Sequence, residues 1–185
     1  MQYFQEDVDL AKIEATALYA GIVVDTKNFA VQTGVRTFDA ASYLRRCGAD
    51  PDIVRDLFSC DFDTVKDRAA ILSGARIKDG IAVASCPKGL ANAMIIAAQA
   101  ADALVNIDKV EASFTFYYLD DGYIGVSARS RGDINVQLVM EAIGGGGHRT
   151  VAGAQVKGRT MEEAQDVVMA ALHEILDKNK EIDEK

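Results

Sequence analysis

The chain has 185 residues, enough for one ordinary domain or two small ones, and 49% of them are hydrophobic, which supports a folded core. Its 20 basic and 28 acidic residues give a net charge of −8. An acidic surface disfavours the long phosphate contacts that duplex or single-stranded nucleic acids need, so we expect no long nucleic acid as a partner.

The first elements are helical. A helix is predicted from Asp9 to about Ala20, followed by a short apolar run from Gly21 to Val24 that ends at Asp25. No apolar stretch reaches the roughly 18 residues of a membrane span, and the segment from Met1 to Asp7 lacks the basic region of a signal peptide. We therefore expect a soluble, cytoplasmic segment without direct membrane contact, and its abrupt start suggests a piece of a longer protein.

Capping residues mark the next two helices. A second helix is predicted to begin at Phe38, with Thr37 as its N-cap and Gly48 as its stop. Asp50 and Pro51 then follow the order of an N-cap and a first-turn proline, which starts another helix. Residues 61–78 form a charged amphipathic pattern, which we interpret as a connector helix between two units.

The second unit alternates strands and helices. A strand is predicted at Ile81–Ser85 and an alanine-rich helix at Ala91–Val105. Two further strands, at Val110–Leu119 and Tyr123–Arg129, are joined by the turn Asp120-Asp121-Gly122. This alternation predicts a sheet with helices packed on it.

A short helix and a long one complete the chain. The short helix is predicted over Asn135–Ile143, and Asn135 suits its N-cap. The last helix opens with Thr160 and Glu163 in a capping-box spacing and continues with apolar residues at helical intervals. We expect His173, beside this apolar stripe, to be a partly exposed surface residue.

Four consecutive glycines, Gly144 to Gly147, precede His148. Glycine suits backbone that needs positive φ or close approach, and a row of N–H donors can form a nest for an anion, with the histidine at its rim. The alternatives are a flexible connector or a helix C-cap, because one glycine after Ile143 would end the preceding helix by itself. Nearby arginines could supply the local positive charge that a small phosphorylated ligand needs: Arg129, Arg131 and Arg149.

The three cysteines, Cys47, Cys60 and Cys86, are an odd number without metal-finger spacing, which fits a reducing compartment. We interpret all three as thiols of the core.

The glycine run with His148 resembles the signature of the substrate-binding domain associated with DHH phosphoesterases. The stretch Ala20 to Phe29 looks like the last metal-binding motif of the DHH catalytic domain. Residues 101–104 and 127–137 are similar to GdpP-type cyclic-di-AMP phosphodiesterases in particular. The resemblance implies an α/β fold, with a helical remnant of the DHH domain over 1–60, a connector helix over 61–79 and a mixed-sheet substrate-binding domain over 80–185.

The resemblance also implies a chemistry. Two manganese ions would activate a water and hydrolyse cyclic-di-AMP to linear pApA, and Asp25 is the metal ligand that carries over. Taken alone, Asp25 could equally be a cap or turn residue after a strand. The other metal-binding motifs of the family are missing, so we expect this polypeptide to bind substrate without hydrolysing it.

Within the substrate-binding domain, the backbone of Gly145, Gly146 and Gly147 is predicted to contact phosphate. His148 would add a hydrogen bond or a charge, Arg129 would contact phosphate or base, and Asn135 is either a substrate contact or a helix cap. Arg131 and Arg149 are weaker candidates, because the sequence does not fix where they point.

Two other functions stay open at this stage. One is a short-oligonucleotide or adenosine bisphosphate phosphatase of the same superfamily, and the other is a non-catalytic nucleotide-binding or interaction module. The partner is then a cyclic dinucleotide or a short adenine nucleotide, a homodimer is left open, and GdpP-type relatives imply a parent anchored in the membrane through upstream segments.

Overall fold

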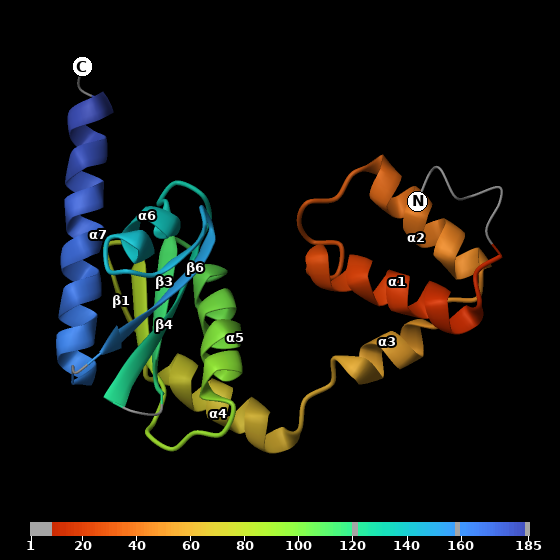
Figure 1. The fold of residues 1–185 in the computed structure, drawn as a ribbon, viewed down its shortest axis with the longest axis horizontal. Helices are drawn as coiled ribbons and strands as arrows, with labels where there is room; N and C mark the ends of the chain where they lie inside the picture. Colours follow the sequence, from red (N-terminus) through yellow and green to blue (C-terminus); the bar gives the residue numbers. More distant parts are fainter. Residues whose placement is uncertain (1–8, 120–121, 158–159, 184–185) are drawn as a thin grey trace. The chain divides into compact units, whose positions relative to one another are not determined.

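The computed structural model describes residues 9–119, 122–157 and 160–183, with side chains up to residue 178. It divides the chain into two compact units, Met1–Cys60 and Asp61–Lys185, which are described separately below (Figure 1).

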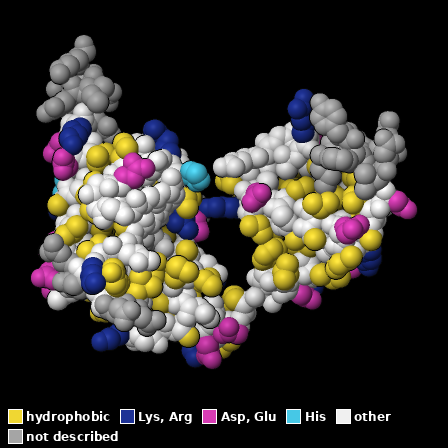
Figure 2. Space-filling view, in the orientation of Figure 1, with side chains coloured by type: hydrophobic (Ala, Val, Ile, Leu, Met, Phe, Trp, Pro, Cys, Tyr) yellow, Lys and Arg dark blue, Asp and Glu magenta, His cyan; other side chains and the backbone are white. Residues whose placement is uncertain are grey.

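Three helices make up the first unit: α1 (Lys12–Asp25), α2 (Val35–Arg46) and α3 (Pro51–Leu57). Its main cluster of buried residues is small and contains Ala15, Leu44 and Ala49, with partly buried side chains packed around them. Many apolar side chains of this unit remain on its surface (Figure 2), among them Val35, Leu57 and Phe58. The first unit therefore has little apolar burial of its own.

Two helix boundaries differ from the prediction. Helix α1 continues through Gly21–Val24 to Asp25, because Ile22 lies on the same helical face as Ala15 and packs on the same core. Helix α2 begins at Val35 with Gly34 as its N-cap. Thr37 is inside this helix, and its hydroxyl oxygen accepts a hydrogen bond from the Gly34 amide at 3.2 Å.

The predicted start of α3 is confirmed. The Asp50 carboxylate accepts a hydrogen bond from the Asp52 amide at 3.0 Å, and Pro51 occupies the first turn. The Lys12 ammonium lies 3.3 Å from the Asp50 carboxylate. This contact, followed by the Asp52 amide, lowers the pKa of Asp50.

The second unit is an α/β structure. Its elements in chain order are α4 (Phe62–Ser73), β1 (Arg76–Lys78), β2 (Ile81–Ser85), α5 (Ala93–Val105), β3 (Ala112–Tyr118), β4 (Tyr123–Ser130), α6 (Val136–Glu141), β5 (Gly146–His148), β6 (Val151–Lys157) and α7 (Met161–Asp183). The strands form a mixed sheet in the order β1-β2-β3-β4-β6-β5. Strands β2 and β3 are parallel, with α5 in the crossover, and the other neighbouring pairs are antiparallel.

Helices cover the two faces of the sheet differently (Figure 1). Helices α6 and α7 pack on one face over a core that includes Phe114, Phe116 and Val126. Helices α4 and α5 pack on the other face, where the core includes Ala97, Leu104 and Tyr117. Contacts of α5 run along β2, β3 and β4, so this second face is less covered towards β6 and β5.

The predicted helix over residues 61–78 is too long. Helix α4 ends at Ser73, and Arg76–Lys78 form the edge strand β1 instead. The reason is the pair Asp79-Gly80, both with positive φ, which makes a two-residue hairpin turn into β2. Helix α4 belongs to the second unit and packs against α5.

The other predicted strands and helices of this unit are confirmed within a few residues of their predicted ends, including the capping box. The Thr160 amide donates to the Glu163 carboxylate at 2.8 Å, and the Glu163 amide donates to the Thr160 hydroxyl oxygen at 3.2 Å. Asp120 and Asp121 of the predicted β3–β4 turn lie outside the described residues. His173 is exposed on α7, as predicted.

The cysteine prediction is correct for one residue of three. Cys86 is buried, but Cys47 is only partly buried, and Cys60, in the segment between α3 and α4, is exposed. The predicted fold class, an α/β chain with a mixed sheet, is confirmed. Within the described ranges, no helix is long and apolar enough to cross a membrane.

Candidate functional site

The sheet register brings several predicted site residues onto one face. Ser127 of β4 pairs with Gly153 of β6, which pairs with Gly146 of β5. In the same way, Arg129 pairs with Val151, which pairs with His148. Directly paired residues project from the same side of a sheet. We call the surface formed by Ser127, Arg129, Gly146, His148 and Gly153 the glycine face.

The glycine face is the side of the sheet on which α5 packs. Tyr117 of β3 pairs with Gly125 of β4, so it projects from the same side as Ser127, and it belongs to the core beneath α5. Because α5 contacts β2, β3 and β4, the strands β6 and β5 offer the accessible part of this face. His148 is exposed there.

Small-ligand sites commonly measure about 300 to 1,000 Å³. The second unit has a cavity of ≈ 510 Å³ on the glycine face. It is lined by Met94, Tyr117, Tyr123, Val126, Ser127, Gly144, Gly145, Gly153, Ala154 and Gln155. Two tyrosine side chains, the Ser127 side chain and glycine backbone therefore meet at the same place.

The Tyr117 ring lies directly on Gly125. A Cβ atom at Gly125 would lie 2.3 Å from the ring, so only glycine lets Tyr117 take this position beside the cavity. Burial, and secondarily the nearby Cys86 thiol, raises the pKa of Tyr117, which therefore stays a neutral phenol at physiological pH. The sequence reasoning overlooked both residues, although their pairing follows from the β3–β4 hairpin.

The glycine run does not form a nest of four free donors. The Gly144 amide donates to the Glu141 carbonyl at 3.1 Å, and the Gly145 amide donates to the Met140 carbonyl at 2.7 Å. With Gly144 at φ +83°, these bonds form a Schellman motif that ends α6, as the C-cap alternative predicted. The Gly145 amide is thereby already hydrogen-bonded.

Gly146, Gly147 and His148 form the edge strand β5 against β6. A Cβ atom at Gly147 would lie 2.5 Å from the Cα of Ala152. The run of glycines thus lets the backbone pack tightly on the small residues of β6, and it places His148 at the end of the edge strand.

Arg129 is held in place by its neighbours. Its Nε–H donates to a carboxylate oxygen of Asp102 on α5 at 3.1 Å, and its Nη1 donates to the Ala128 carbonyl at 3.0 Å. The exposed fraction of the Arg129 side chain is only 13%. A guanidinium oriented in this way suits a phosphate or a base edge.

Three other predicted residues make structural contacts. Arg131 donates to the carbonyls of Val105 and Ile107 at the end of α5, at 3.0 and 3.1 Å. Arg149 donates to the Gly132 carbonyl at 2.9 Å. The Asn135 side chain accepts a hydrogen bond from the Gln137 amide at 3.1 Å, so Asn135 is the N-cap of α6.

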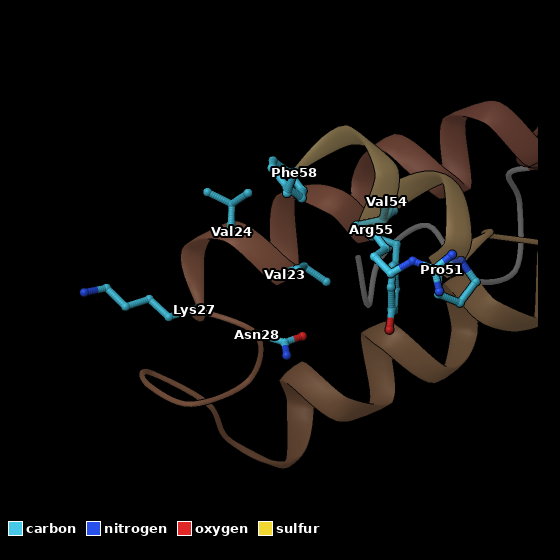
Figure 3. A pocket seen from close by; sticks show the side chains of 9 residues that line it. Val23, Val24, Lys27, Asn28, Pro51, Val54, Arg55 and Phe58 are labelled. Carbon is cyan, nitrogen blue, oxygen red and sulfur yellow. The ribbon is translucent and has the colours of Figure 1, made fainter. Parts of the chain in front are cut away.

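Asp25 lies in the first unit, exposed at the last position of α1. The buried Thr26 follows it and organises the turn, since its hydroxyl donates to the Ile22 carbonyl at 2.6 Å and accepts from the Phe29 amide at 2.9 Å. A cavity of ≈ 440 Å³ adjoins this turn; it is lined by Tyr19, Val23, Val24, Lys27, Asn28, Pro51, Val54, Arg55 and Phe58. Its lining is mainly apolar, and the Lys27 side chain points away from it (Figure 3).

The described residues do not make a complete metal centre. Among them, no group of three or more His, Cys, Asp or Glu side chains could hold a metal ion. A pair of manganese ions needs several oxygen or imidazole ligands, and Asp25 by itself cannot supply them. The residues that the structure describes therefore do not by themselves fit a dinuclear metal site.

The comparison with known families concerns the second unit, which contains the mixed sheet. A family model described as the DHHA1 domain matches residues 78–177. The chain therefore belongs to the DHHA1 domain family.

Two similar proteins are cyclic-di-AMP phosphodiesterases. The cyclic-di-AMP phosphodiesterase PdeA of Listeria monocytogenes is 46% identical over 171 residues, which cover 91% of this chain and 26% of PdeA. The cyclic-di-AMP phosphodiesterase GdpP of Geobacillus thermodenitrificans is 44% identical over 183 residues, which cover 98% of this chain and 28% of GdpP. The chain thus spans about a quarter of the length of these relatives, in agreement with the resemblance noted in its motifs.

A solved structure shares the fold. An exopolyphosphatase-related protein from Bacteroides fragilis superposes with a TM-score of 0.77 at 22% identity, covering 89% of this chain and 51% of that one. At this identity the likeness concerns the fold alone.

Proposed function

We propose that the second unit binds cyclic-di-AMP, or a short adenine nucleotide derived from it, as the substrate-binding part of a phosphodiesterase. The observation that carries this proposal is the register of β4, β6 and β5, which puts Arg129 and His148 on the same face of the sheet as Ser127. Ser127 lines the cavity of ≈ 510 Å³ on that face. The names of the relatives PdeA and GdpP supply the candidate substrate.

Each part of the glycine face has a role in this proposal. Arg129, already oriented, donates to phosphate or to a base edge. His148 adds a hydrogen bond or, when protonated, a positive charge. The glycine backbone of β5 and β6 lets the ligand approach the sheet closely, because no side chain stands in its way at Gly146 and Gly153.

In the parent protein, residues 1–60 would be the end of the DHH catalytic domain and residues 80–185 the DHHA1 domain. Manganese ions would supply the activated water for hydrolysis, with Asp25 as one of several ligands. Because Asp25 is the one ligand proposed within this chain, we expect binding without turnover.

Calorimetric titration of the chain with cyclic-di-AMP and with pApA, in the absence of metal, tests the binding proposal. We expect a dissociation constant in the micromolar range, on the order of −8 kcal/mol, and a large loss of affinity in His148→Ala. The matched control is His173→Ala, since His173 is exposed on α7 at the opposite face of the sheet. Equal affinity in both variants and the unchanged chain would contradict the proposed site.

The absence of turnover has its own test. The chain is incubated with cyclic-di-AMP and Mn²⁺, and the products are separated by chromatography. We expect no pApA above a protein-free control, and pApA formation that depends on Asp25 would overturn this part of the proposal.

A further inference from the structure

Arg129 has one terminal nitrogen that its protein contacts leave available. Its Nε–H is bonded to Asp102 and its Nη1 to Ala128, whereas Nη2 has no hydrogen bond within the described part of the chain. Nη2 is also not among the fully buried polar atoms without a partner. It is therefore the nitrogen of this guanidinium that keeps its donors for a ligand.

Asp102 fixes the plane of this guanidinium from the neighbouring helix. A free arginine side chain has about 2 kcal/mol of rotamer entropy, and ordering it on binding weakens affinity. The exposed side-chain fractions are 13% for Arg129 and 34% for Asp102, so water screens this pair less than a pair on the open surface. The carboxylate thus orders Arg129 before any ligand arrives.

Helix α5 does not need Asp102 to stay on the sheet. The Ser113 hydroxyl donates to the Ala101 carbonyl at 2.7 Å, and Arg131 donates to two carbonyls at the end of α5. Ala101 and Leu104 on either side are fully buried. We therefore expect α5 to stay docked on the sheet when the Asp102 carboxylate is removed.

We propose that Asp102 is a positioning residue of the nucleotide site, which orients Arg129 so that its Nη2 donates to the ligand. The inference rests on the proposed function, because the ligand it concerns is the nucleotide on the glycine face. Asp102 itself need not touch that ligand.

The direction in which the affinity changes when Asp102 is replaced distinguishes positioning of Arg129 from a simple charge effect of the carboxylate. Removing a negative charge near an anionic ligand should strengthen binding if only Coulomb attraction matters. Positioning predicts the opposite, so we expect Asp102→Ala to weaken binding of cyclic-di-AMP by about tenfold. Asp102→Asn keeps an oxygen acceptor for the Arg129 Nε–H, and we expect it to recover part of this loss.

A double-mutant cycle tests whether Asp102 acts through Arg129. In the native background we expect Arg129→Ala to weaken binding strongly, whereas in the Asp102→Ala background it should add only about threefold or less. Arg131→Ala is the matched control, because it removes the hydrogen bonds that Arg131, near Arg129 in the chain, makes at the end of α5. The affinity of this variant for cyclic-di-AMP should change by no more than about twofold. Additive losses, or tighter binding in Asp102→Ala, would overturn the proposal.

Nuclear magnetic resonance gives a readout that needs no ligand. The Arg129 Nε–H signal should be sharp and slow to exchange in the unchanged chain and in Arg131→Ala, and broad or absent in Asp102→Ala. If the unchanged chain bound neither cyclic-di-AMP nor pApA, the proposed function would fail, whereas this signal would still decide whether Asp102 orders Arg129. A sharp signal that persists in Asp102→Ala would overturn the inference.

Discussion

Gly145 and Gly146 are adjacent, yet the space beside them differs. A Cβ atom at Gly145 would lie 2.3 Å from the Gly153 carbonyl oxygen, whereas nothing lies within 4 Å of one at Gly146. The two positions therefore separate glycines that the packing of the sheet requires from glycines that leave room for a ligand.

Substitution by alanine measures this difference. We expect Gly145→Ala to lower the free energy of unfolding by about 2 kcal/mol, because the backbone of β6 must move to admit the methyl group. Gly146→Ala should change it by less than about 0.5 kcal/mol, while it weakens nucleotide binding by narrowing the glycine face. Urea unfolding of both variants, followed by circular dichroism, checks the prediction, and equal destabilisation would contradict it.

Two of the cysteines, Cys60 and Cys86, differ in burial, and we expect them to differ in reactivity. Burial raises the pKa of the Cys86 thiol to about 11, because the thiolate loses its hydration, whereas Cys60 is exposed. Because folding raises the pKa of Cys86, its contribution to the stability of the folded chain is present below the pKa of the unfolded thiol. This contribution is lost as the pH rises towards the pKa of the folded thiol. At pH 8 we expect a thiol reagent to label Cys60 promptly and Cys86 only after unfolding; prompt labelling of Cys86, identified by peptide mass, would show the burial to be wrong.

For single residues, the sequence indicated which side chains belong to the candidate site, but it did not show which of them make structural contacts instead. Arg129 and His148 were predicted as neighbours in function, and the register places them on one face. Arg131 and Asn135 turned out to bond to helix ends, which depends on where α5 and α6 lie and so cannot be read from local sequence. Asp102 was missed as a partner of Arg129 because 26 residues separate them in the chain.

At the scale of elements, most helices and strands followed from periodicity and capping, whereas β1, β5 and β6 were not predicted. Strands β1 and β5 have three residues each and lie at the sheet edges, too short to show an alternating pattern. Strand β6 begins with the small residues Val151 to Ala154, which show no clear alternation of polar and apolar side chains. The pair Asp79-Gly80 was the available signal for the β1–β2 hairpin. For β5 no comparable signal existed, since a glycine-rich strand has no side-chain pattern.

The capping box of α7 allows a direct test of one element. Thr160→Ala removes the hydroxyl that accepts from the Glu163 amide, and we expect the free energy of unfolding to fall by about 1 kcal/mol. Thr160→Ser keeps the hydroxyl and should restore most of this loss. Denaturant titrations of the three chains compare them, and an alanine variant as stable as the native chain would argue against the cap.

On the scale of the whole molecule, the two units have cores of different size. Among the described residues, the first unit has one small cluster of buried side chains, Ala15, Leu44 and Ala49, while the second unit has an extensive core on each face of its sheet. The sequence predicted a helical part followed by an α/β part, but it could not show how little the helical part buries, because burial depends on how the helices pack.

Separate cores predict separate unfolding transitions. Leu44 and Phe114 are both fully buried, one in each unit. We expect Leu44→Ala to destabilise the unit that unfolds in a first, weaker transition, and Phe114→Ala to destabilise the unit that unfolds in the second. Each substitution should lower the free energy of unfolding of its own unit by about 3 kcal/mol. Hydrogen exchange with mass spectrometry assigns each transition to its unit, and a single transition shifted by both substitutions would contradict independent cores.

The central claim is that the nucleotide binds on the glycine face, and a titration followed by amide resonances tests it most directly. On addition of cyclic-di-AMP, we expect shifts at Ser127, Arg129, Gly146, His148 and Gly153, with little change along α7 and in residues 12–57. Shifts confined to α7 or to the first unit would contradict the account, as would a spectrum that the nucleotide leaves unchanged.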